Sequence, residues 1–129
     1  MLFRSPASDP GLLGIDEIAA LDLPKTDLVV LSACNAAAGE PWGSEGVASI
    51  ASAFIRAGVP AVVASLWEVE DEGSAIMLAS FYEELRRGVD PLSALRNAQV
   101  RAVQARDPAT RHPGRWAAFQ LIGGISPKR

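Results

Sequence analysis

Two apolar segments separated by a helical pattern constrain the fold of this sequence more than any other feature. We expect strands over Asp27–Cys34 and Ala61–Trp67, because each contains a run of Leu, Val and Ala without the polar alternation of a half-exposed strand. Between them, apolar residues recur at helical spacing from Val47 to Ile55, and Gly58 ends the pattern. A strand, a helix and a strand in this order predict a parallel pair joined by a crossover, and therefore an α/β fold with a mostly parallel sheet.

The rest of the sequence adds helices and one more strand to this unit. We expect helices over Asp16–Leu21 and Asp71–Arg87, a helix capped by Asp90 with Pro91 at its first position, a loop over Asp107–Arg115 and a last strand over Trp116–Ile122. The two longer helices should each bury an apolar stripe. The first stripe contains Met77, Leu78, Phe81, Tyr82 and Leu85, and the second contains Leu92, Leu95, Ala98 and Ala102. A chain of 129 residues has the length of a single domain.

Composition and charge exclude several classes of function. The chain has 12 Lys and Arg residues against 15 Asp and Glu residues, so it lacks the basic face that a nucleic-acid partner needs. No apolar stretch approaches the roughly 20 residues of a membrane span, and no glycine-rich phosphate-binding motif is present. A single cysteine rules out an internal disulfide and is typical of a reducing, cytoplasmic setting. We therefore expect a cytoplasmic protein without a cofactor, a metal, a nucleic-acid partner or a membrane partner.

Sites in open α/β sheets form at the carboxyl ends of the strands. The first predicted strand ends at Ser32–Asn35, and the second leads into Trp67–Asp71. Because parallel strands end on the same edge, the thiol of Cys34, a tryptophan and several carboxylates should meet there. The helix that starts near Gly46 should direct its N-terminus, with its partial positive charge, at the same edge.

The sequence alone leaves two interpretations of Cys34. A thiol attacks well only as a thiolate, which a base, a cation or a helix N-terminus stabilises, and its position at a strand end favours such a role. Free cysteines are also among the most buried residues and often fill space in a core.

Four motifs occur in an order and spacing that resemble the CHAT family of caspase-like cysteine peptidases, which are related to separases. The motifs are Leu28–Cys34 (LVVLSAC), Gly43–Val47 (GSEGV), Val63–Trp67 (VASLW) and His112–Phe119 (HPGRWAAF). The resemblance implies a caspase-like three-layer sandwich in which helices flank a mostly parallel sheet. It also implies a connection to tetratricopeptide-repeat regions, to which these domains are usually attached.

The resemblance implies that Cys34 is the nucleophile of a cysteine endopeptidase. The base in that family is the His of a His-Gly motif at the end of an earlier strand, and this sequence lacks that motif. We therefore interpret residues 1–129 as a partial CHAT domain, its C-terminal half, and expect little or no peptidase activity from the chain alone. His112 is the one histidine and lies in a His-Pro turn, where a hydrogen-bonded structural role is favoured over catalysis.

The resemblance also assigns substrate-binding residues after the second strand. Ser65, Trp67 and Glu68 correspond to the strand end that pairs with the substrate backbone in caspase-like enzymes. Asp71 would line the pocket for the residue before the cut and select Arg or Lys. The alternative for Asp71 is that it opens a helix, where an acidic side chain interacts favourably with the helix dipole.

Two other functions stay open at this point. A non-catalytic interaction or regulatory module on the same fold would use the edge near Cys34 to bind a peptide or a partner. A receiver-like or flavodoxin-like domain fits least, because the carboxylates that receivers cluster at early strand ends are missing. A sheet without its N-terminal strands exposes unpaired edges, so we expect the chain to form an oligomer with a second copy or to associate with the missing half of the domain.

Overall fold

The computed structural model describes residues 14–32 and 44–123, and these residues form six helices and three strands. In chain order they are α1 (Ile15–Ala19), β1 (Leu28–Leu31), α2 (Ser44–Arg56), β2 (Ala61–Ser65), α3 (Asp71–Arg86), α4 (Pro91–Val103), α5 (Pro108–Arg111), α6 (Pro113–Trp116) and β3 (Phe119–Gly123). The two predicted strands Asp27–Cys34 and Ala61–Trp67 correspond to β1 and β2, and the four predicted helices correspond to α1–α4, with ends that shift by a few residues.

The three strands form one sheet in the order β1–β2–β3. β1 and β2 are parallel, with Leu31 opposite Ala64, which confirms the predicted parallel pair. β3 runs antiparallel to β2, with Phe119 opposite Ser65. The sheet of the described residues is therefore mixed, with one parallel and one antiparallel pairing.

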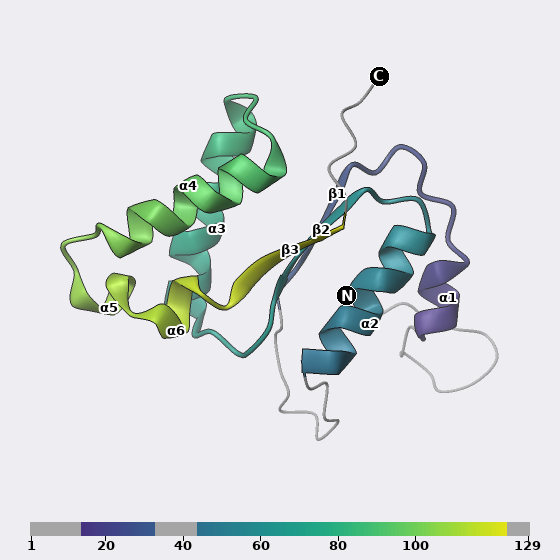
Figure 1. Ribbon diagram of the computed structural model, residues 1–129, viewed down its shortest axis with the longest axis horizontal. Coiled ribbons are helices and arrows are strands. Elements are labelled where there is room, and N and C mark those ends of the chain that lie inside the picture. The colour runs from purple at the N-terminus through teal and green to yellow at the C-terminus, as the bar shows by residue number, and fades with distance from the viewer. Residues whose placement is uncertain (1–13, 33–43, 124–129) are drawn as a thin grey trace.

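The direction of β3 follows from the helices that precede it. α3 leads away from the end of β2, and α4 returns alongside α3, so the chain comes back to the edge of the sheet that it left (Figure 1). A strand that re-enters the sheet from this edge has to run against β2.

Helices cover both faces of the sheet, which gives three layers (Figure 1). α3 and α4 lie on one face, and α1 and α2 lie on the other. Successive strand residues point to opposite faces, so Val63 packs in a cluster with Phe81 of α3, whereas Val62 packs in a second cluster with Ala51 of α2. The predicted α/β fold, in which helices flank a parallel pair, is confirmed.

β2 is the most deeply buried element of the described chain. All of its residues, Ala61–Ser65, are buried, because it has a strand on each side and a helical layer on each face. β1 lies at an edge of the described sheet, and each of its residues is only half-buried.

The predicted loop over Asp107–Arg115 is wrong, because this segment contains two short helices. Each starts with a capping side chain followed by proline, whose missing N–H costs nothing at a helix start. Asp107 accepts hydrogen bonds from the backbone and the hydroxyl of Thr110 at the start of α5. The Nδ1 atom of His112 accepts a hydrogen bond of 2.9 Å from the backbone N–H of Gly114 at the start of α6.

The last strand begins later than the predicted Trp116–Ile122. Trp116 ends α6 instead, and its indole N–H donates to the carbonyl of Arg111 at 3.0 Å, which holds the ring against α5. The side-chain amide of Gln99 donates to the carbonyls of Trp116 and Phe119, so the turn between α6 and β3 is fixed to α4.

The buried faces of α3 and α4 differ from the predicted stripes at two large side chains. Tyr82 and Leu92 are 45% and 46% exposed. Ala94 takes the place of Leu92 in the core, together with Leu95 and Ala98.

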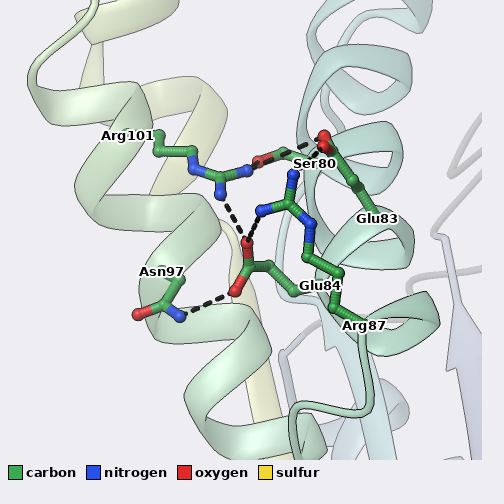
Figure 2. A network of polar contacts seen from close by, with 6 residues as sticks. All are labelled: Ser80, Glu83, Glu84, Arg87, Asn97 and Arg101. Carbon is green, nitrogen blue, oxygen red and sulfur yellow. Dashed lines mark hydrogen bonds and ion pairs between the residues drawn. The ribbon is translucent and has the colours of Figure 1, made fainter.

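A buried carboxylate joins α3 to α4. Glu84 is 4% exposed, and one of its oxygens accepts a hydrogen bond of 2.8 Å from the side-chain amide of Asn97 (Figure 2). Its other oxygen binds the guanidinium group of Arg101, and Arg87 lies 3.6 Å away. The hydrogen bond from Asn97 lowers the pKa of Glu84 most, and the two arginines lower it further, while burial acts in the opposite direction.

Acid should destabilise the fold through three carboxylates. The pKa of Glu84 is lowered by the contacts above, that of Asp90 by the backbone N–H of Ser93, and that of Asp107 by the side chain of Thr110. A group with a lowered folded-state pKa stabilises the fold fully above its ordinary value, 4.5 for Glu and 3.8 for Asp, and loses this contribution as the pH falls through the folded-state pKa.

We therefore expect the free energy of unfolding, measured with urea, to change little through these groups between pH 7 and 5 and to fall steadily below pH 4.5. A variant that combines Glu84→Gln with Asp90→Asn keeps hydrogen-bond acceptors at both positions and removes two of the three titrations. It should lose less stability between pH 5 and 3 than the parent. Equal losses would show that other groups control acid stability.

Candidate functional site

The carboxyl ends of the two parallel strands lie next to each other. Leu31, the last residue of β1, is opposite Ala64, and β2 ends one residue later at Ser65, so both strands end at the same edge of the sheet. Figure 1 shows α2 starting towards this edge and running back along the sheet. The predicted convergence of both strand ends at one edge is therefore confirmed for the described residues.

Cys34 lies outside the described residues, as do the other residues of the segment 33–43. Its role as a nucleophile stays a prediction, and so does the role of the loop that follows it.

Ser65 and Trp67 have different environments at this edge. Ser65 is buried, and the next residue, Leu66, donates its backbone N–H to the carbonyl of Ala118 at 2.8 Å, so the residue before β3 holds this part of the chain. Trp67 is 43% exposed, and its indole N–H donates to the carbonyl of Gly114 at 2.8 Å. The Trp67 ring is thus fixed to α6 while one side of it stays accessible.

A surface pocket of about 570 Å³ lies beside Trp67, between the segment after β2 and the two short helices. It is lined by Glu68, Val69, Glu70, Pro108, Ala109, His112, Gly114 and Arg115. Among the predicted substrate-binding residues, Glu68 lines this pocket, whereas Ser65, Trp67 and Asp71 do not. Asp71 is exposed at the first position of α3, which agrees with its alternative role at a helix start.

Sequence reasoning did not identify Arg115, the main cation of the pocket. Its side chain is 13% exposed, and its guanidinium group forms an ion pair with Glu70 and lies 3.9 Å from a carboxylate oxygen of Glu72. Gly73 of α3 is buried against it. The only signal in the sequence was the run of three acidic residues at positions 70–72. Carboxylates that pack against the rest of the protein need a cationic partner, so this run indicated that a Lys or Arg lies nearby.

His112 has the structural role that the sequence analysis favoured. It is exposed and caps α6 through Nδ1, which accepts the hydrogen bond from the Gly114 N–H. Because Nδ1 is the acceptor, the neutral ring carries its proton on Nε2.

The described part of the chain offers no metal centre: it contains no group of three or more His, Cys, Asp and Glu side chains that could hold an ion. Nor does any helix within residues 14–32 and 44–123 have the length and apolar character to cross a membrane.

Comparisons with known proteins confirm the resemblance to the CHAT family. Residues 1–124 match the CHAT domain family. The chain is 35% identical over 112 residues to tetratricopeptide repeat protein 28 of Homo sapiens and 35% identical over 96 residues to the protein of the same name from Mus musculus. These alignments cover 87% and 74% of this chain, but the chain spans only 4% of the length of each relative.

Proposed function

This chain belongs to the CHAT domain family, and on that basis we propose that it carries the nucleophile of a cysteine endopeptidase site, Cys34. The family match over residues 1–124 is the observation that carries the proposal. The parallel pairing of β1 and β2 supports it, because a residue that closely follows β1 leaves the sheet on the same edge as the pocket beside β2.

In this proposal the thiolate of Cys34 attacks the carbonyl carbon of a peptide bond and forms an acyl-enzyme, and the leaving amine takes up a proton. The N-terminus of α2 favours the thiolate electrostatically. The proton transfer requires a base, which in the family is the His of a His-Gly motif. The single histidine here, His112, is followed by Pro113 and caps a helix. We infer that the base comes from outside these 129 residues and that the chain alone has little or no activity.

The substrate would lie along the edge formed by the segment after β2. Ser65 would contribute through its backbone, since its side chain is buried, and Trp67 would form a wall. The carboxylates of Glu68 and Asp71 are both exposed and would favour Arg or Lys before the cut.

A non-catalytic peptide-binding module is the second candidate, and the role of His112 favours it. The Nδ1 atom of His112 accepts the Gly114 N–H at the start of α6, so this nitrogen serves the helix cap and is not free to take up a proton from a thiol. The same edge would then bind a peptide without cleaving it.

Partners follow from the same reasoning. The relatives are named for tetratricopeptide repeats, and we propose that such regions accompany this chain. The half-buried β1 lies at an edge of the described sheet, and this edge is where the remaining part of a CHAT domain, or a second copy of the chain, would add strands.

The decisive experiment measures covalent labelling of Cys34 by an electrophilic peptide probe. The chain has one cysteine, so each labelled molecule reports this site. Adding a CHAT segment that carries the His-Gly motif should accelerate labelling by at least about 100-fold, the size expected of a general base. The same segment with its His replaced by Ala is the matched control, and Cys34→Ala should abolish labelling. Slow labelling that the segment does not change would reject the peptidase and favour the binding module.

A further inference from the structure

The charge of the pocket beside β2 depends on one residue that links α6 to the start of α3. Arg115 lies on α6, its ion-pair partner Glu70 precedes α3, and Glu72 lies in the first turn of α3. The Arg115 side chain is 87% covered, since it is 13% exposed, whereas the Glu70 and Glu72 side chains are 58% and 78% exposed. The arginine is therefore the fixed centre of the group, and the carboxylates gather around it.

Close packing holds Arg115 in this position. Gly73 faces the arginine, and a Cβ atom at this position would lie 2.9 Å from the Cγ atom of Arg115. Only glycine lets the aliphatic part of Arg115 lie this close to the first turn of α3. On the other side, the Trp67 indole binds the carbonyl of Gly114, the residue before the arginine.

Glu68 differs from the other acidic residues of the pocket. It lines the pocket and is exposed, and it forms no ion pair with any described residue, whereas Glu70 is bound to Arg115. For a cationic group in the pocket, the Glu68 carboxylate is therefore available for an ion pair, whereas the charge of Glu70 is already balanced by Arg115.

We propose that Arg115 is the positioning residue that sets the specificity of this pocket, by holding Glu70 and Glu72 in ion pairs and leaving Glu68 to select a basic side chain. The inference rests on the proposed function in one respect: it assumes that the occupant is a side chain of a peptide. An acidic occupant is disfavoured, because it would have to displace Glu70 from a guanidinium group that is largely covered.

The test compares the reversible binding of three probes: N-acetyl arginine amide, N-acetyl norleucine amide and N-acetyl glutamate amide. NMR of the Trp67 indole N–H and the Gly114 amide in the full chain reports binding at the pocket. The wild-type chain should prefer the arginine probe over the norleucine probe. Arg115→Gln should raise this preference about 3- to 30-fold, since two released carboxylates add attraction for a cation at about 6 Å. Arg115→Lys should keep the wild-type preference, and Glu68→Gln should remove it.

The ratio of the two affinities separates specificity from simple loss of structure. A loosened pocket would weaken both probes together and leave the ratio unchanged. If Arg115→Gln does not fold, Gly73→Ala serves as the second variant, because it keeps the positive charge, displaces it from Glu70 and should raise the ratio by a smaller factor.

An unchanged ratio in both variants, a preference for the glutamate probe, or no binding of any probe to the wild type would overturn the role of Arg115. These measurements do not depend on Cys34. If the pocket prefers the arginine probe but Cys34 is never labelled, the peptidase proposal is rejected and the role of Arg115 stands. If Cys34 is labelled but the pocket shows no preference among the probes, the role of Arg115 is rejected and the peptidase proposal stands.

Discussion

Replacing Phe81 with alanine is expected to lower the free energy of unfolding by about 3–5 kcal/mol. Phe81 is 1% exposed and is among the largest fully buried side chains of the described chain. It belongs to the same core cluster as Val63 of β2 and Leu95 of α4, which joins the helical layer to the sheet. Removing the ring loses its transfer free energy and leaves a cavity that neighbouring alanines are too small to fill.

Tyr82→Ala is the matched control for this prediction. Tyr82 is the next residue of α3, it is 45% exposed, and its ring contacts that of Phe81 with centroids 5.6 Å apart. Both substitutions remove this ring contact, which contributes about 0.5–1.5 kcal/mol, so their difference isolates the burial of Phe81. Urea unfolding followed by circular dichroism gives both values. Losses of equal size would mean that the helical layer does not depend on this core.

The regular elements were predictable because their signals are local and strong. β1 and β2 are runs of Val, Leu and Ala. A strand that has a helical layer on each face needs apolar residues at successive positions, and these runs provide them. The start of α4 was equally clear, since the Asp90 side chain accepts a hydrogen bond of 3.0 Å from the Ser93 N–H and Pro91 occupies the first helical position. The same Asp-Pro signal occurs at Asp107 and a His-Pro variant occurs at His112, but four-residue helices bury too little surface for periodicity to reveal them.

The choice of buried side chains was less predictable, because it depends on how closely elements approach one another. Periodicity favoured the large residue Leu92 for the core of α4, but Ala94 is buried in its place, beside the predicted Leu95 and Ala98. Small side chains let α4 lie close to α3 and to the turn that Gln99 holds. The distance between two helices depends on how they pack against each other, so it cannot be read from the sequence of either helix alone.

In the candidate site, too, the features with a local sequence signal were predicted and those that depend on packing were not. The strand-end rule located the edge of the sheet, and Glu68 does line the pocket there. The opposite wall comes from α5 and α6, which were predicted to be a loop, so the ion pair of Arg115 with Glu70 was missed. These residues lie far apart in the sequence and meet only because the α3–α4 hairpin brings the chain back to the edge of β2.

Gly123→Ala is expected to lower the free energy of unfolding by about 2–4 kcal/mol, for two reasons that add. Gly123 has φ of +114°, a conformation that residues with a side chain rarely adopt. A Cβ atom there would also lie 2.6 Å from the carbonyl oxygen of Pro60 and 3.2 Å from the Cδ1 atom of Ile55. The oxygen belongs to the backbone just before β2, so relief of the contact requires β3 to move away from its partner Ala61.

Gly88→Ala separates the effect of the backbone conformation from that of the steric clash, because Gly88 has a positive φ but no close neighbour. Gly88 has φ of +85°, but a Cβ atom would meet nothing within 4 Å, so the expected loss is about 1 kcal/mol. The difference between the two variants in urea unfolding therefore measures how tightly β3 closes on the start of β2. A large difference would show that the close approach of Gly123 to the Pro60 carbonyl contributes more to the loss than the backbone conformation does. Equal losses at both glycines would mean that the end of β3 moves away from the Pro60 carbonyl at little cost.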